Sequence, residues 1–156
     1  MWIVLELLTS INPRRREVTV PQLNGLARVT LSVRDRDESV RFYRSVLGFK
    51  VLERRDHDGT LRSECRHPAS GLMVALIQHR DNFKNRFDRR HCGLDRLTLG
   101  VDNLGELEAW EERFSDMDVE HSPVMHREEG STLLFYDPDG TELGLFCPAE
   151  LDAGEA

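Results

Sequence analysis

The feature that most constrains the fold of this chain is an internal repeat. Residues 25–33 read GLARVTLSV, and 68 residues further along the chain residues 93–101 read GLDRLTLGV. In both copies apolar side chains alternate with other residues at a period of two, which is the pattern of a β-strand with one buried face. A chain that repeats one strand this closely is built from two copies of a single supersecondary unit.

A helix is predicted after each copy of the repeated strand. In the first copy Asp35 or Asp37 serves as the N-cap and Gly48 ends the helix, and in the second copy Asn103 serves as the N-cap. Apolar residues at helical spacing define the predicted buried faces, which are Val40, Tyr43, Val46 and Leu47 in the first helix and Leu104, Leu107, Trp110 and Phe114 in the second.

Turn residues divide the chain after each helix into three short strands. The turns fall at Asp58-Gly59, residues 68–71, Glu129-Gly130 and residues 137–140. We therefore predict an α+β fold of two tandem βαβββ modules that together form one domain. The predicted boundaries are an N-terminal extension at residues 1–23, a first module at 24–90, a second module at 91–148 and a flexible tail at 149–156.

Charge and cysteine content exclude several functional classes. The formal net charge is −7 and the basic residues are scattered among acidic ones, so we expect no nucleic-acid partner. The three cysteines form no CxxC pair, which suits a reducing compartment and predicts the cytoplasm. The apolar opening MWIVLELL is short and contains Glu6, so we expect neither a signal peptide nor a membrane-spanning helix.

Two segments resemble a known family. SVRFYRSVLGF at residues 39–49 and FYDPDGTELGLF at residues 135–146, set in paired βαβββ modules, resemble the vicinal oxygen chelate superfamily. That group includes glyoxalase I, extradiol dioxygenases, and fosfomycin- and bleomycin-resistance proteins. The resemblance covers roughly residues 24–148 and implies a mixed sheet curled around a cavity, a divalent metal inside the cavity, and a homodimer.

This chain departs from the family at the positions of the metal ligands. The family takes these ligands from four strand positions, with His or Gln on the first strand of each module and Glu or His near the last. The resemblance places these positions at Arg28, at Arg96, at Gly144 and near Ile77, where Gln78 or His79 could serve if the alignment shifts by one or two residues.

None of the three firmly placed residues can bind a cation. A guanidinium group stays protonated and offers only hydrogen-bond donors, and glycine has no side chain. His79 and Glu142 alone are too few for Zn²⁺ or Mn²⁺, which need three or four well-placed ligands. We therefore expect no metal and no cofactor in this site.

In the family geometry Arg28 and Arg96 converge on the place of the missing metal, where two unpaired charges would cost several kcal/mol. Something negative must therefore lie between them. One alternative is Glu142, which shares a strand face with Gly144 and would make a buried cluster that braces the two modules. The other is a bound carboxylate, phosphate or enolate, which a guanidinium fork binds through two parallel hydrogen bonds.

Further side chains complete the predicted site. Thr30 and Thr98 share the face of the two arginines, and either Phe135 or Tyr136 must point inward as an aromatic wall. His79, at the end of a predicted inward strand, is a candidate acid or base. The predicted substrate-binding residues are Arg28, Arg96, Thr30, Thr98 and Phe135, and the predicted catalytic residues are Glu142 and His79.

These assignments favour a metal-independent protein that acts on an anionic or carbonyl-bearing small molecule. Fixed positive charge can stabilise a developing enolate or oxyanion, which suits lyase, isomerase or cyclase chemistry. The alternatives are a protein that only binds or sequesters a small molecule, as in antibiotic resistance, and a degenerate relative kept for dimerisation. A metal-dependent lyase or dioxygenase is less favoured.

Overall fold

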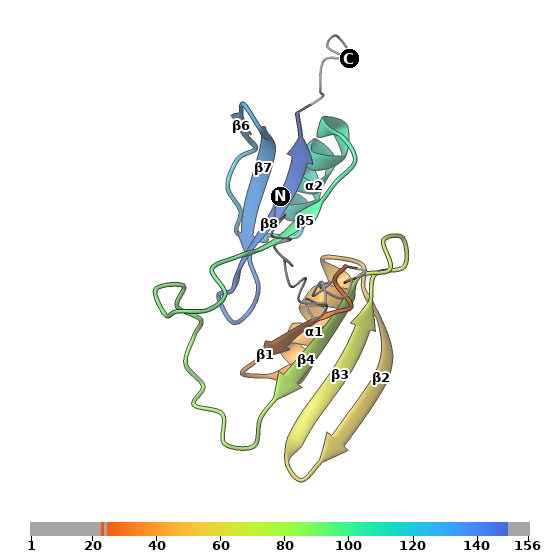
Figure 1. Cartoon of the computed structure of the whole chain (residues 1–156), viewed down its shortest axis with the longest axis vertical. Helices are drawn as coiled ribbons and strands as arrows, with labels where there is room; N and C mark the ends of the chain where they lie inside the picture. The colour runs from red at the N-terminus through yellow and green to blue at the C-terminus, as the bar shows by residue number, and fades with distance from the viewer. Residues whose placement is uncertain (1–22, 24, 150–156) are drawn as a thin grey trace, which may run out of the picture.

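The structure is a computed structural model that describes residue 23 and residues 25–149. The predicted N-terminal extension and C-terminal tail therefore lie outside the described residues, apart from Leu23 and Ala149. The first module contains β1 (Val29–Ser32), α1 (Arg36–Ser45), β2 (Lys50–His57), β3 (Thr60–Arg66) and β4 (Met73–Gln78) (Figure 1). The second contains β5 (Leu97–Gly100), α2 (Leu104–Asp116), β6 (Met125–Arg127), β7 (Gly130–Tyr136) and β8 (Glu142–Pro148).

Each module forms its own four-stranded mixed sheet. The strand orders are β1-β4-β3-β2 and β5-β8-β7-β6, and only the β1–β4 and β5–β8 pairs are parallel. The predicted α+β fold of two tandem βαβββ modules is confirmed, although the two sheets do not close into a barrel. Within residues 25–149, neither helix is long and apolar enough to span a membrane.

Side-chain caps define the start of both helices. The carboxylate of Asp35 accepts hydrogen bonds from the backbone N–H groups of Asp37 and Glu38, so Asp35 rather than Asp37 is the first N-cap. The side chain of Asn103 caps α2 in the same way, through the N–H group of Glu106. The sequence signals therefore located the start of α2 at Asn103 and that of α1 to within two residues, and the structure decides for Asp35.

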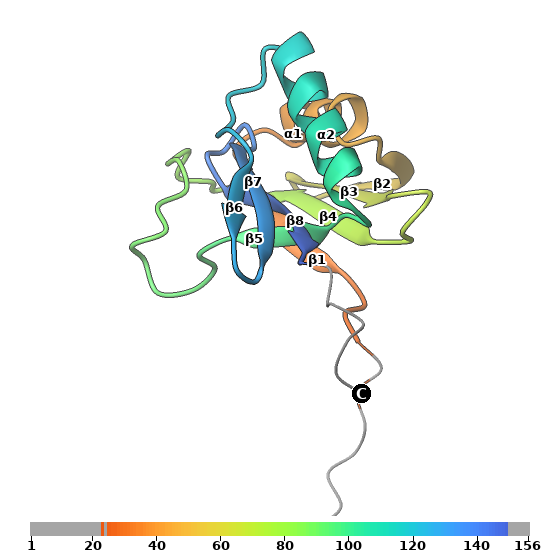
Figure 2. The same cartoon turned by 90° about the horizontal axis from the view of Figure 1, so that it is seen from above.

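Both helices cover the same side of the sheets, and the two modules share one hydrophobic core (Figure 2). The ring of Phe135 lies at the junction, 4.6 Å from the ring of Phe114 on α2 and 6.5 Å from that of Phe42 on α1. Among residues 25–149 no helix covers the opposite side of either sheet, and Thr30 and Thr98 are exposed there. The packing thus leaves an open face on each sheet.

We expect Phe135→Ala to destabilise the whole chain in a single transition, because the ring fills the junction between the modules. Its exposed area is 0%, and removing a buried phenylalanine ring costs about 3–5 kcal/mol. Urea unfolding followed by circular dichroism measures the loss. The matched control is Phe83→Ala, because Phe83 is 91% exposed. A change in Phe135→Ala no larger than in this control would contradict the shared core.

Candidate functional site

The two open faces carry the same arrangement of side chains at equivalent positions. Thr30 on β1 pairs with Ala75 on β4, and Thr98 on β5 pairs with Gly144 on β8. The equivalent of Gly144 in the first module is therefore Ala75, which corrects the sequence-based placement near Ile77 by two residues. Both of these positions thus hold a small residue, Ala75 in the first module and Gly144 in the second.

The side chain of Arg96 fills the space beside Gly144. A Cβ atom built at Gly144 would lie 3.2 Å from Oγ1 of Thr98 and 3.4 Å from Cδ of Arg96, so a larger side chain at this position would press on both. With this register, the four positions that the resemblance predicts for metal ligands hold Arg28, Ala75, Arg96 and Gly144.

These four residues do not fit a metal ion. None has a lone pair to donate, and two carry a positive charge that repels a cation. In the part of the chain that the structure describes, no three His, Cys, Asp or Glu side chains are grouped so that they could hold a metal.

Glu142 is the centre of the polar cluster on the second sheet. Its side chain is buried, with 6% of its surface exposed. Oε1 of Glu142 accepts from Nε and lies in ion-pair contact with Nη2 of Arg96. Oε2 accepts from Nη1 of Arg89 at 3.1 Å and from the hydroxyl of Tyr136 at 3.3 Å. Both carboxylate oxygens are thus engaged, so Glu142 anchors Arg96 in this arrangement.

A cleft of about 260 Å³ adjoins this cluster, lined by Phe87, Asp88, Arg89, Tyr136, Gly140 and Glu142. Arg89 belongs to the connection between the modules, and sequence reasoning missed it because that segment has no strand or helix periodicity to assign its side chains to a face. Tyr136 was one of the two residues, with Phe135, that the sequence offered as an aromatic wall of the site. The connection is therefore part of the site as well as a link between the modules.

Arg28 forms a separate cluster on the first sheet. Its Nη1 lies 3.0 Å from Oε1 of Glu64, and Nη2 of Arg62 lies 2.6 Å from the same oxygen. The hydrogen bond from Arg62, together with the charges of both arginines, lowers the pKa of Glu64. Among the described residues, no carboxylate pairs with both Arg28 and Arg96. Glu142 pairs with Arg96 and not with Arg28, so it does not lie between the two arginines.

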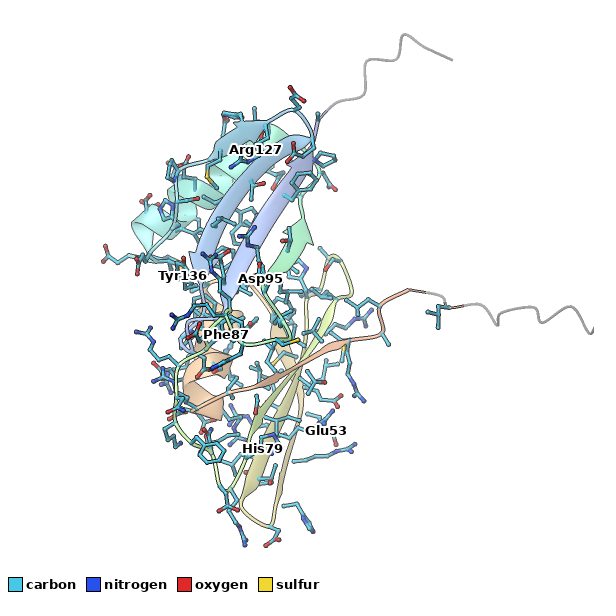
Figure 3. The ribbon with its side chains drawn as sticks, turned by 60° about the vertical axis from the view of Figure 1, so that its left-hand side comes forward. Glu53, His79, Phe87, Asp95, Arg127 and Tyr136 are labelled. Atoms are coloured by element: carbon cyan, nitrogen blue, oxygen red, sulfur yellow. The ribbon has the colours of Figure 1, made fainter. Side chains whose placement is uncertain are left out.

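The structure also separates other residues that sequence analysis grouped together. Phe135 lies in the core, so its assignment as a wall of the ligand cavity is wrong, and Tyr136 takes the open face because neighbouring strand residues point to opposite sides. His79 is exposed and lines a different cleft from Glu142. Figure 3 shows Tyr136 and Phe87 on the second-module side of this view and His79 farther along, toward the first sheet.

The hairpin at residues 137–140 positions Glu142 at the start of β8. Oδ1 of Asp137 accepts from the backbone N–H groups of Thr141 at 2.8 Å and Asp139 at 3.0 Å, which closes the turn. The hydroxyl of Tyr43 lies 3.5 Å from Oδ2 of Asp137. Burial raises the pKa of Asp137 from 3.8 to about 6, although the backbone donors oppose the shift.

We expect Asp137→Asn to stabilise the protein at pH 8 and to have little effect at pH 4. The raised pKa means that folding favours the protonated carboxyl, so this group's stabilising contribution is present below pH 3.8 and is lost as the pH rises through about 6. Asparagine keeps the turn acceptor without the charge. The free energy of unfolding of the variant, minus that of the wild type, should rise by up to about 3 kcal/mol from pH 4 to pH 8. Urea unfolding at both pH values measures this difference. The same difference in free energy of unfolding at both pH values would contradict the raised pKa of Asp137.

Comparisons with known proteins place the chain among relatives of similar build. The model of the Glyoxalase/Bleomycin resistance protein/Dioxygenase superfamily matches residues 25–145. A solved glyoxylase/bleomycin resistance protein/dioxygenase domain from Frankia sp. EAN1pec is 31% identical, with a TM-score of 0.76 over 81% of this chain and 99% of that one.

Two further relatives are more distant. The antibiotic binding protein TnmS3 from Streptomyces sp. CB03234 is 20% identical, with a TM-score of 0.65 over 83% of this chain and 100% of that one, and so shares the fold. A putative ring-cleaving dioxygenase, MhqA, from Bacillus subtilis is 26% identical over 139 residues, which are 83% of this chain. The match spans 42% of that relative's length.

Proposed function

This chain belongs to the Glyoxalase/Bleomycin resistance protein/Dioxygenase superfamily, and we propose that it acts without a metal on an anionic or carbonyl-bearing small organic molecule held by Arg28 and Arg96. One observation carries the proposal. At the positions that the resemblance predicts for metal ligands, this chain has two guanidinium groups and two residues without a donor atom in their side chains, Ala75 and Gly144. The chemistry of these positions suits an anion.

Both arginines keep donors available for a ligand. Arg28 bonds to Glu64 through Nη1, and its side chain is 49% exposed. Arg96 meets Glu142 through Nε and Nη2, which leaves Nη1 directed away from that carboxylate. A planar pair of oxygens, as in a carboxylate, fits such a guanidinium edge. Thr30 and Thr98, exposed on the same faces, add hydroxyl donors to the proposed site.

As an enzyme, the protein would use Arg96 to stabilise negative charge that develops on a substrate oxygen. Lyase, isomerase or cyclase chemistry needs such stabilisation together with a group that moves a proton. Glu142 can take this role when a substrate anion draws the half-exposed Arg89 away, which leaves the hydroxyl of Tyr136 as the remaining protein donor to Oε2. His79 would act only on a ligand large enough to extend from one cleft to the other.

A second candidate is a protein that binds a small molecule without turning it over, as in sequestration of an antibiotic. The engagement of both oxygens of Glu142 favours this reading, because a carboxylate that accepts from three side chains is a poor base. The solved relative TnmS3 is described as an antibiotic binding protein, which gives the alternative a precedent on this fold.

We include a homodimer and a cytoplasmic location in the proposal. The open faces of both sheets carry half-buried apolar side chains such as Leu134, Phe146 and Met73, which a second copy could cover. Cys65, Cys92 and Cys147 are all free, which supports a reducing compartment. Light scattering during size-exclusion chromatography tests the dimer, and a monomer at micromolar concentrations would contradict it.

We expect Arg96→Ala and Arg28→Ala each to weaken the binding of small carboxylates by about tenfold or more, because each removes a charge-assisted pair of donors. Calorimetric titration with pyruvate and with inorganic phosphate measures the change. Arg44→Ala is the matched control, because Arg44 is an exposed arginine on α1. Equal affinity in the wild type and all three variants would show that neither Arg28 nor Arg96 binds the ligand. Turnover lost together with binding would favour the enzyme over the sequestering protein.

Elemental analysis of the purified protein should find less than about a tenth of an equivalent of any divalent transition metal, because the ligand positions hold no lone-pair donors. Titration of the same sample with Mn²⁺, Ni²⁺ and Zn²⁺ should release no binding heat. Close to one tightly held ion per chain would overturn the metal-independent proposal and restore the dioxygenase or lyase alternative.

A further inference from the structure

We propose that a second cleft, formed by the connection between the modules, binds a small organic anion that carries a planar ring. The cleft has a volume of about 420 Å³, within the range of small-molecule sites. Three separate segments line it: the end of β1 at residues 32–34, the connection at residues 79–87, and the hairpin residues Asp139 and Thr141. We call it the connection cleft. The proposal is independent of the function proposed above.

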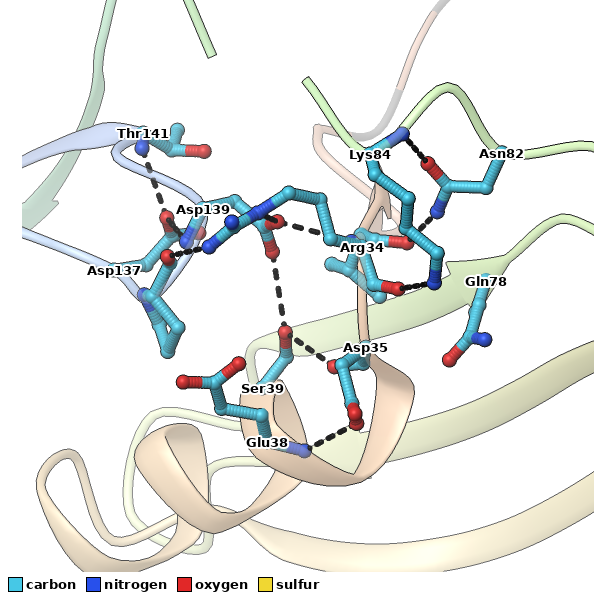
Figure 4. Close-up of polar contacts among 12 residues, drawn as sticks. Arg34, Asp35, Glu38, Ser39, Gln78, Asn82, Lys84, Asp137, Asp139 and Thr141 are labelled. Atoms are coloured by element: carbon cyan, nitrogen blue, oxygen red, sulfur yellow. Dashed lines mark hydrogen bonds and ion pairs between the residues drawn. The ribbon is translucent and has the colours of Figure 1, made fainter. Parts of the chain in front are cut away.

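The connection is held in place as a wall of this cleft (Figure 4). Nδ2 of Asn82 donates to the carbonyl of Val33 at 2.7 Å, and Nζ of Lys84 donates to the carbonyl of Arg34 at 2.6 Å. Lys84 adopts a φ of +59°, a left-handed conformation that a non-glycine residue adopts at a cost. Farther along, the N–H group of Phe87 donates to the carbonyl of Asp139 at 2.9 Å. A long connection fixed at several points is typical of a binding loop.

Four charged side chains line the cleft, Arg34 and Arg86 together with Asp81 and Asp139. Their formal charges cancel, so an anion would need a guanidinium that has no carboxylate partner. Arg34 is already neutralised, since its Nε lies 2.9 Å from Oδ1 of Asp139 and its Nη2 donates to the carbonyl of Pro138 at 2.6 Å. Arg86 differs, because it has no carboxylate partner among the described residues. Its Nε lies 3.6 Å from the position of a Cβ atom built at Gly140, so Arg86 lies beside the hairpin. Arg86 is thus an exposed guanidinium at the cleft that can meet an anionic group.

The same wall exposes aromatic surface. Phe83 is 91% exposed, and Phe87 is half-buried. A phenylalanine ring left in water loses the free energy that its burial would contribute. A ligand with a planar ring can cover Phe83 while its anionic group meets Arg86, and the side-chain amides of Asn82 and Asn85 offer further donors. Aromatic carboxylates combine a planar ring with an anionic group.

Benzoate is a suitable probe, and Arg96→Ala protein weakens the contribution of the other proposed site. We expect saturable benzoate binding to this protein by calorimetry, at least about tenfold weaker binding when Arg86→Gln is added, and weaker binding with Phe83→Ala. Adding Arg44→Gln should change nothing. Inorganic phosphate and benzyl alcohol should each bind more weakly than benzoate, since each offers only one of the two features.

Chemical-shift mapping of the wild-type protein keeps the proposal testable if Arg96→Ala does not fold. Benzoate should shift the side-chain amide signals of Asn82 and Asn85. Equal affinity with and without Arg86→Gln, loss of all binding in folded Arg96→Ala protein, or the absence of saturable binding would each overturn the connection cleft as a site. Loss of carboxylate binding in Arg86→Gln with Arg96 intact would instead contradict the function proposed above.

Discussion

The packing of Phe135 against one ring from each helix is the interaction on which the rest of the structure depends. Phe114 and Phe135 belong to the second module and Phe42 to the first, so this contact joins two repeated units in one core. Because both helices cover the same side of the sheets, no helix or strand of the described residues covers the other side of each sheet. The two arginines and the two threonines of the repeated strands lie on that open side, where a ligand or another chain can reach them.

The distribution of charge on the open faces follows from the cost of leaving a guanidinium unpaired. Each module compensates its own arginine with its own carboxylate, Glu64 on β3 in the first and Glu142 on β8 in the second. Each guanidinium therefore has a carboxylate partner within its own module. This pairing sets the main chemical limit on the site, because the buried carboxylate of Glu142 is engaged by three donors.

The hairpin at residues 137–140 links the core to both clefts. Asp139 accepts from the hydroxyl of Ser39 on α1 and pairs with Arg34 at the end of β1, so a turn of the second module is tied to the first. Glu142 follows the turn on one side and the connection cleft borders it on the other. One buried turn therefore positions the residues of two separate proposed sites. Because the pKa of the Asp137 carboxyl is raised, the stability of this turn depends on pH.

The sequence by itself determined the repeat, the order of elements, the helix caps and the turns, because these depend on periodicity and on local backbone preferences within a few residues. It also placed Arg28 and Arg96 on equivalent strand faces. Only the tertiary structure decided which carboxylate pairs with each arginine, since Glu64 and Arg89 reach their partners across strands or from a segment without periodicity. The tertiary structure also decided that Ala75 is the residue paired with Thr30, because this pairing depends on cross-strand register. Alternation showed that Phe135 and Tyr136 point to opposite faces, but the packing of the two helices decided which face is the core.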